Sequence, residues 1–180
     1  MSREIPQDVR ERASRVTLVL MDADGVMTDG RIITVDDGRD ARAYHARDGL
    51  AVRLGQAAGL AFGVVSGRRS EAVERRAQEL DYVEIHQGVG DKGKLVEEIA
   101  KRRGVPLDAI CFIGDDIVDV PAFRRCGLAI APADSDPEVF PRVHWVGACE
   151  GGRGIVREAV GLILRARGAW ERATASYLGT

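Results

Sequence analysis

The chain has 180 residues, 26 basic against 28 acidic side chains and a formal net charge of −2, which is the size of one domain with a buried core. That charge gives no electrostatic reason to expect nucleic acid or an anionic membrane as a partner, and no apolar run approaches the ~18 residues of a membrane span. Cysteines without paired spacing, and an N-terminal segment without the apolar core of a signal peptide, predict a cytoplasmic protein without disulfides or zinc.

Short apolar segments alternate with amphipathic helical patterns along the chain. The strands expected in chain order are residues 16–21, 60–65, 82–86, 109–113, 128–131 and 143–146. The expected helices are residues 50–58, 71–80, 93–103 and 155–167. Two extended runs, residues 31–35 and 39–45, flank Asp36-Asp37-Gly38 and predict a β-hairpin. The alternation predicts an α/β fold in a single domain of residues 1–180: a doubly wound, mostly parallel Rossmann-like sheet with helices on both faces.

A glycine-rich segment, Gly151-Gly152-Arg153-Gly154, precedes the last expected helix. It resembles a phosphate cradle, but the strands before it do not suit a dinucleotide site. We therefore expect a tight turn that shapes the C-terminal tail.

The first expected strand ends in two carboxylates, Asp22 and Asp24. Because neighbouring residues of an extended strand point to opposite sides, these two lie on the same side. Two close negative charges repel each other, and chains usually tolerate them only around a cation. Ligands bind at the carboxyl ends of strands in open α/β sheets, and Gly25 lets the backbone turn away sharply. This segment therefore predicts an active site.

Other strand ends carry polar groups that combine with this pair. The strand of residues 60–65 is followed by Ser66 and the Gly67 amide, a hydroxyl and a backbone donor suited to a phosphate oxygen. The strand of residues 109–113 leads into the carboxylates Asp115, Asp116 and Asp119. Lys92 adds a positive charge at the start of a helix. Carboxylates for a hard cation, beside donors for an anion, predict a site for Mg²⁺ and a phosphate group.

Four segments in order resemble the motifs of the haloacid dehalogenase superfamily of phosphatases. They are Asp22-x-Asp24-Gly25-Val26-x-Thr28-Asp29, Ser66-Gly67, Lys92 and Gly114-Asp115-Asp116-x-x-Asp119. The closer resemblance, from about residue 16 to the end of the chain, is to the 3-deoxy-D-manno-octulosonate 8-phosphate phosphatase family of lipopolysaccharide synthesis. It also rests on Thr28-Asp29-Gly30, Ala46-Arg47-Asp48-Gly49, Ser66-Gly67-Arg68 and the glycine-rich segment. Members of this family have no cap domain, so none is expected here.

The resemblance implies hydrolysis of a phosphorylated acidic sugar through an aspartyl-phosphate intermediate. Asp22 would attack the phosphorus, and Asp24 would protonate the leaving sugar oxygen and then deprotonate the hydrolytic water. Ser66 and Lys92 would complete the catalytic set.

The resemblance also implies a Mg²⁺ site. The ligands would be the Asp22 carboxylate, the Asp24 backbone carbonyl and Asp115, with the metal screening the repulsion between nucleophile and phosphate. Asp116 and Asp119 would lie behind these ligands and orient them. Spacing alone leaves open whether Asp115 or Asp116 touches the metal, and the family pattern favours Asp115.

The substrate-binding residues are likewise implied by the family. They are Asp24, His45, Ala46, Arg47, Asp48, Gly49, Arg53, Gly67, Arg68, Arg76 and Lys92. Arg68 and Arg76, eight residues apart, would share one face of a helical stretch. A sister group that acts on nine-carbon sugar 9-phosphates typically carries Gly-Glu-Lys where this chain has Gly67-Arg68-Arg69, so Arg68 favours the eight-carbon acid.

Capless members of the superfamily build a tetramer in which the hairpin and the C-terminal tail of neighbours close each site. Residues 30–45 and 165–180 match those elements. The resemblance therefore implies a symmetric homotetramer.

Three other functions fit parts of the pattern. One is a phosphatase for a nine-carbon, sialic-type sugar 9-phosphate. Another is a signalling receiver, although receivers place their acidic pair before the phosphorylated aspartate of a later strand. The last is a non-catalytic oligomerisation domain of the same fold, which the full set of catalytic positions disfavours.

Overall fold

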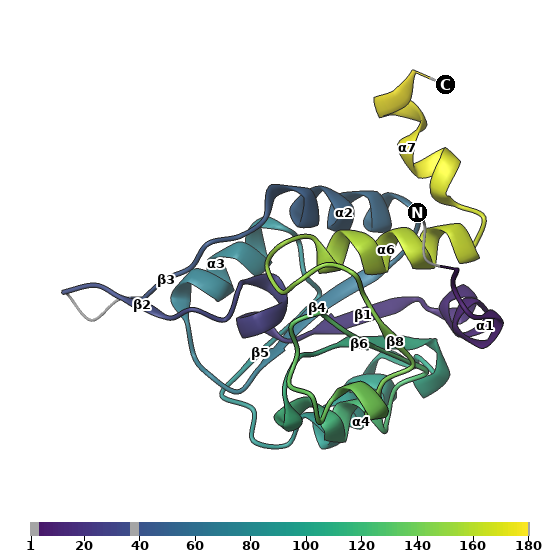
Figure 1. The fold of residues 1–180 in the computed structure, drawn as a ribbon. Helices are drawn as coiled ribbons and strands as arrows, with labels where there is room; N and C mark the ends of the chain where they lie inside the picture. The colour runs from purple at the N-terminus through teal and green to yellow at the C-terminus, as the bar shows by residue number, and fades with distance from the viewer. Residues whose placement is uncertain (1–3, 37–39, 180) are drawn as a thin grey trace.

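The computed structural model describes residues 4–36 and 40–179 and contains a six-stranded parallel sheet in the order β5-β4-β1-β6-β7-β8 (Figure 1). The strands are β1 Leu18–Met21, β4 Ala61–Ser66, β5 Glu84–Gln87, β6 Ile110–Ile113, β7 Leu128–Ala131 and β8 Trp145–Val146. The helices are α1 Gln7–Arg15, α2 Ala46–Ala57, α3 Glu71–Glu79, α4 Lys92–Arg103, α5 Val120–Phe123, α6 Ile155–Ala166 and α7 Trp170–Leu178. None of the helices in the described residues has the length and apolar character to cross a membrane.

Helices cover both faces of this sheet, which confirms the predicted doubly wound architecture (Figure 1). Because strand residues alternate in direction, Val19 and Met21 face one core while Leu18 and Leu20 face the other. Residues of α1, α2, α3 and α6 pack into the first core. Residues of α4 and α5 pack into the second. The central strands are therefore apolar on both sides, which is why they read as continuous hydrophobic runs in the sequence.

Capping interactions fix where two of these helices begin. The Val73 N–H donates to Ser70 Oγ at 3.2 Å at the start of α3, and the Lys94 N–H donates to Asp91 Oδ1 at 3.0 Å at the start of α4. Gly104, with φ of +64°, ends α4 in the left-handed conformation. Since Asp91 is the cap, Lys92 is the first residue of α4 and lies at the end of the sheet where the strands terminate.

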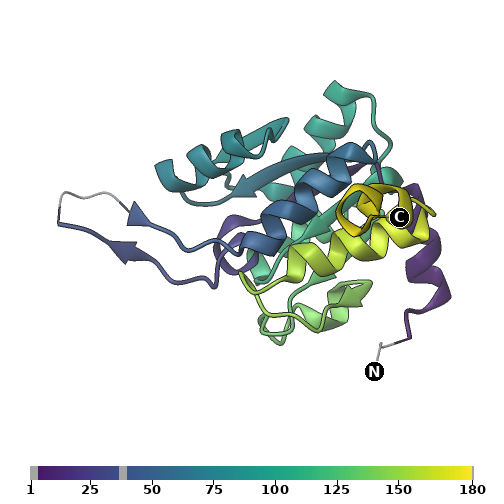
Figure 2. The same ribbon diagram turned by 90° about the horizontal axis from the view of Figure 1, so that it is seen from above.

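The predicted hairpin is present but short. Strands β2 Ile33–Thr34 and β3 Asp40–Ala41 are antiparallel, with Thr34 opposite Asp40. The turn residues Asp37 and Gly38, with Arg39, lie outside the described residues. The two arms project away from the sheet and its covering helices in both views (Figures 1 and 2).

Three helices were not predicted: α1, the short α5 and α7. Helix α1 lies in the charged N-terminal segment, where Val9 and Ala13, four residues apart, are buried against the first core. Helix α7 lies in the expected C-terminal tail, for which no secondary structure was predicted, and projects from the body (Figure 1). It is attached through Trp170, whose ring lies under the guanidinium groups of Arg157 at 4.9 Å and Arg165 at 4.0 Å.

The glycine-rich turn does more than shape the tail. The Gly152 N–H donates to the Val26 carbonyl at 2.9 Å. A Cβ on Gly151 would overlap the Gly25 carbonyl oxygen, and one on Gly152 would overlap the Thr28 backbone. The turn is therefore packed against the loop after β1, and glycine is required for that close approach.

Candidate active site

The acidic motifs meet where the strand order of the sheet reverses. The chain builds outward from β1 through β4 to β5, then returns to place β6 on the other side of β1. Ligands of open α/β sheets bind at such a switch point, outside the carboxyl ends of the strands. Asp22 follows β1 and Asp115 lies just after β6, so the topology brings the first and last acidic motifs together.

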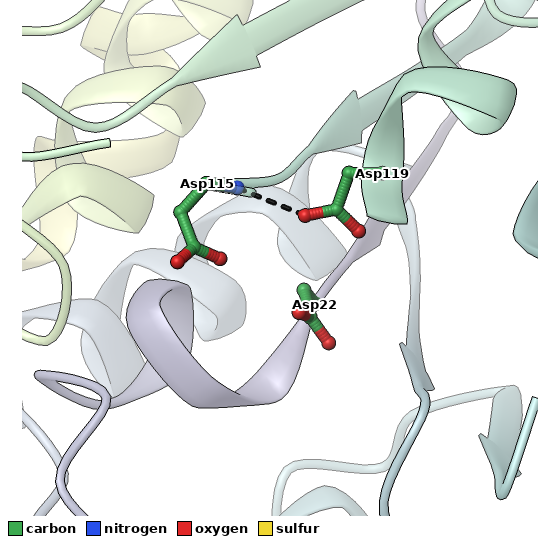
Figure 3. Close-up of side chains that lie close together, drawn as sticks. All are labelled: Asp22, Asp115 and Asp119. Carbon is green, nitrogen blue, oxygen red and sulfur yellow. Dashed lines mark hydrogen bonds between the residues drawn. The ribbon is translucent and has the colours of Figure 1, made fainter. Parts of the chain in front are cut away.

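One carboxylate oxygen from each of Asp22, Asp115 and Asp119 lies within 4.8 Å of the other two (Figure 3). Asp22 and Asp119 are buried, and Asp115 is partly buried. The charge opposite them is Lys92, whose Nζ lies 3.0 Å from Asp22 Oδ2 and 2.6 Å from Asp119 Oδ1. Three carboxylates around one buried ammonium leave the site with an excess of negative charge.

The buried Lys92 is held in its charged form. Burial by itself lowers the pKa of Lys92, but the adjacent carboxylates of Asp22 and Asp119 outweigh burial and raise that pKa above its usual value. The other Asp22 oxygen, Oδ1, accepts the Ala23 N–H at 2.7 Å. The Asp22 carboxylate is thus oriented by a backbone donor on one oxygen and by an ammonium on the other.

The contacts of Asp119 and Asp116 separate their roles from that of Asp115. Asp119 Oδ2 accepts the N–H group of Asp115 at 2.9 Å (Figure 3). The same oxygen accepts the N–H group of Asp116 at 3.2 Å, while the other Asp119 oxygen is bound to Lys92. Asp116 is exposed, and its side chain caps the short helical turn Ile117–Asp119. The carboxylates of Asp119 and Asp116 already accept backbone N–H groups. Asp115 is therefore the carboxylate of this loop that can bind a ligand.

The surroundings of Asp115 fit a metal ligand. Its Oδ1 is buried and finds no hydrogen-bond partner among the residues that the structure describes. Burial, and then the charges of Asp119 and Asp22, raise the pKa of Asp115 to about 8. Burial and Asp119 also raise the pKa of Asp22 to about 7, against the opposing effect of Lys92. A divalent cation between Asp22 and Asp115 would offset the repulsion, so the residues present fit Mg²⁺.

Asp24 points toward the hairpin and is bound there by an arginine that the sequence did not single out. Arg42 Nε donates to Asp24 Oδ1 at 2.9 Å. Arg68 Nε lies 3.8 Å from Asp24 Oδ2. One signal for Arg42 was available in the sequence. Asp40 and Arg42 are two residues apart on the returning arm of the predicted hairpin, so their side chains lie on the same side and can form an ion pair.

The second motif lies beside the first on the neighbouring strand. Ser66, the last residue of β4, is buried, and its Oγ accepts the Arg68 N–H at 3.2 Å. The register pairs Met21 of β1 with Val64 of β4, which brings the Ser66–Gly67 turn alongside Asp22. Ser66, Gly67, Lys92 and the carboxylates therefore lie at one edge of the sheet.

The segment from His45 to Gly49 begins α2 and lies between the hairpin and α6. Asp48 Oδ1 accepts the Arg157 N–H of α6 at 2.7 Å, and burial raises the pKa of the Asp48 carboxyl. Ala46 and Arg47 are exposed, whereas Gly49 is buried under the Arg76 guanidinium. This part of the predicted substrate-binding set thus joins α2 to its neighbours.

The three predicted arginines are not gathered at one place. Arg68 lies in the loop before α3, so it does not share a helix face with Arg76. Arg76 pairs with Glu79 at 2.9 Å and lies over the Tyr44 ring. Arg53 pairs with Asp81, beyond the C-terminal end of α3, and donates to the carbonyl of Glu79, the residue whose carboxylate pairs with Arg76.

A cavity of about 350 Å³ opens beside the site, between the hairpin and α3. Three of its lining side chains are arginines: Arg68, Arg69 and Arg75. The others include Asp40, Glu71 and the apolar Ile32. The sequence assigned a role to Arg68 alone: Arg69 only completes the Gly67-Arg68-Arg69 segment, and Arg75 belongs to no motif.

Comparisons with known proteins agree with this geometry. The model of the haloacid dehalogenase-like hydrolase family matches residues 70–158. A 3-deoxy-D-manno-octulosonate 8-phosphate phosphatase from Yersinia pestis is 35% identical over 94% of this chain and 91% of its own length. The corresponding phosphatase of Escherichia coli K12 is 31% identical over 94% of this chain and 90% of its own length.

Solved structures lead to the same group of proteins. The crystal structure of this phosphatase from Moraxella catarrhalis, in complex with a magnesium ion, a phosphate ion and a KDO molecule, superposes with a TM-score of 0.92. That match is 31% identical and covers 94% of this chain and 98% of the other.

Proposed function

We propose that this chain, which belongs to the 3-deoxy-D-manno-octulosonate 8-phosphate phosphatase family of haloacid dehalogenase-like hydrolases, hydrolyses that sugar phosphate at the carboxylate site between β1 and β6. The products are the free sugar acid, a precursor for lipopolysaccharide, and phosphate. One observation carries the function: Asp22 is oriented by Lys92 and faces Asp115, whose buried Oδ1 has no partner among the described residues and could accept a cation. The names of the relatives do not favour the nine-carbon alternative.

Asp22 is the nucleophile in this proposal. Its Oδ1 is held by the Ala23 N–H, so the carboxylate is fixed for in-line attack on phosphorus. The new bond joins an Asp22 oxygen to phosphorus, and the bond from phosphorus to the sugar oxygen breaks. Lys92, Ser66 Oγ and the Gly67 N–H are the groups of this chain that would bind the phosphate oxygens.

Asp24 carries the proton in both halves of the reaction. It gives its proton to the leaving sugar oxygen, and the resulting carboxylate then takes a proton from the water that cleaves the aspartyl-phosphate. That second step returns Asp22 as a carboxylate and Asp24 in its acid form, so protons balance over the cycle. Arg68, beside Asp24 and the cavity, would bind the acidic sugar.

Magnesium fits the remaining part of the site. Asp22, Asp115 and the Asp24 backbone carbonyl would hold it, with Asp119 and Asp116 fixing the loop that carries Asp115. When bound, it supplies positive charge that offsets the repulsion between a carboxylate nucleophile and a phosphate ester.

Phosphate release tests this proposal directly. The substrates are 3-deoxy-D-manno-octulosonate 8-phosphate, a nine-carbon homologue and a plain hexose phosphate, each with Mg²⁺ and with EDTA. We expect release that EDTA abolishes, with kcat/KM for the eight-carbon acid at least about tenfold above the others. Comparable rates on all three would refute the substrate assignment while keeping the chemistry. No release from any would favour a non-catalytic oligomerisation domain.

We also propose that the chain acts as one domain of residues 1–180 in a cytoplasmic homotetramer. Its cysteines are unpaired, which suits a reducing compartment. Two projecting elements expose apolar side chains: the hairpin, where Ile33 is 51% exposed, and α7, where Tyr177 is 64% exposed. Such residues on projecting segments suit contacts with other copies of the chain.

The tetramer predicts a molar mass of four times the 19.5 kDa of one chain by light scattering. Ile33→Asp should lower that mass and the turnover together, because it puts a charge into the proposed contact. Leu107→Asp is the matched control, since Leu107 is also exposed but lies at the opposite end of the sheet. A monomeric mass with full activity in the parent protein would contradict the assembly.

A further inference from the structure

Arg42 is the most thoroughly buried arginine side chain near the site, at 1% exposed, and no motif contains it. It follows β3, on the arm that returns from the hairpin to α2. A buried guanidinium needs acceptors for its N–H groups, so the acceptors of Arg42 indicate its role.

The guanidinium is anchored to the hairpin before it reaches the site. Nη1 lies 3.0 Å from Asp40 Oδ2 and donates to the Ala41 carbonyl at 3.2 Å. These contacts come from its own arm, so they fix the planar group relative to the hairpin. Its Nε then donates to Asp24 Oδ1 at 2.9 Å. Arg42 is therefore a fixed donor, and Asp24 is the side chain that it orients.

The Asp24 side chain otherwise has little to hold it. It is 19% exposed and is followed by Gly25, whose φ of +86° marks a sharp turn. The second arginine beside it, Arg68, is 60% exposed and lies 3.8 Å away, beyond a good hydrogen bond. A short aspartate side chain without Arg42 could rotate away from the leaving group at little cost.

We propose that Arg42 is the positioning residue for Asp24, holding that carboxyl group where it can exchange a proton with the leaving oxygen and then with water. The inference rests on the proposed function, in which Asp24 is the acid and base. It adds a second role for the hairpin, which fixes a catalytic side chain of its own chain.

The proposal predicts an effect that depends on the leaving group. A sugar alcohol leaves only when protonated, whereas p-nitrophenolate leaves readily as an anion. In Arg42→Met we expect kcat on the sugar phosphate to fall about 100-fold, with KM changed by less than about threefold. With p-nitrophenyl phosphate, the first step should stay fast, and rapid mixing should show a burst of about one nitrophenolate per site. Slow turnover should follow, because water attack still needs a positioned Asp24.

Two further variants complete the test. Arg42→Lys should recover part of the lost kcat, since an ammonium can replace one contact but not the fork between Asp24 and Asp40. Arg142→Met is the matched control: the Arg142 side chain is 39% exposed and pairs at 3.2 Å with Glu138, so its removal should change kcat on both substrates by less than about twofold.

The possible failures are distinguishable. If Arg42→Met keeps the parent kcat on the sugar phosphate, Arg42 does not position Asp24, although the phosphatase function stands. If the burst and the sugar-phosphate rate fall together, Arg42 only maintains the fold, and that result also overturns the proposal. If the parent enzyme itself releases no phosphate, the proposed function has failed instead.

Discussion

Replacing Asp22 with asparagine is expected to abolish turnover, lowering kcat by at least about 10³-fold, while the protein stays folded. Asparagine has nearly the same shape, and its oxygen can still accept the Ala23 N–H that now orients Asp22. Lys92 keeps its contact with Asp119 at 2.6 Å. The lost property is the negative oxygen that attacks phosphorus, and nothing else in the site replaces a nucleophile.

The measurement is phosphate release together with acid-quenched labelling. The parent protein should retain labelled phosphate in a bond that hydroxylamine cleaves, as an aspartyl-phosphate does, and Asp22→Asn should retain none. Asp8→Asn makes the same charge change in exposed α1 and should behave like the parent. A normal turnover rate in Asp22→Asn would disprove the covalent mechanism.

The fold was predictable because its central strands are buried on both faces. Such strands appear as unbroken apolar runs, and each expected run corresponds to a strand, with ends that differ by a few residues. Helices α1 and α7 were missed for the opposite reason. Their sequences are largely polar, without a long apolar stripe. Both helices are stabilised by packing against α6, and α7 also by the stacking of Trp170 on Arg165.

The meeting of Asp22, Ser66 and Asp115 was predictable because topology alone brings these residues together. Parallel strands end at one edge, so any residue that follows β1, β4 or β6 arrives beside Asp22. Side chains that come from elements outside the parallel sheet could not be placed at the site from the sequence. Arg42 comes from the hairpin, and its contact with Asp24 depends on how that hairpin folds back. Arg53 was placed near the sugar by analogy, and its partner Asp81 could not be read from spacing.

The choice between Asp115 and Asp116 illustrates the difference between spacing and geometry. The residues are adjacent and identical, so the sequence treats them alike. Their backbone N–H groups even share one acceptor, Asp119 Oδ2. Only the side chains separate them: the Asp116 carboxylate bonds to the Ile117 N–H, while Asp115 Oδ1 is buried without a partner among the described residues.

That difference predicts opposite outcomes for one conservative substitution. Asp115→Asn should raise the Mg²⁺ concentration needed for half-maximal activity about 100-fold or more, because it removes a charged ligand. Asp116→Asn should raise it by less than about tenfold, since asparagine also caps a helical turn and the position is exposed. Activity measured across a Mg²⁺ titration gives both values.

Thermal unfolding of the same variants separates metal binding from folding. In the Mg²⁺-free protein, burial raises the pKa of Asp115 to about 8, so above the unfolded value near 3.8 its ionisation opposes folding. Removing that group should therefore maintain or raise the Tm of the metal-free protein at pH 8, and the stabilisation by Mg²⁺ should disappear. A lower metal-free Tm in Asp115→Asn, or equal losses of Mg²⁺ affinity in both variants, would mean that Asp115 supports the fold and that the metal is held elsewhere.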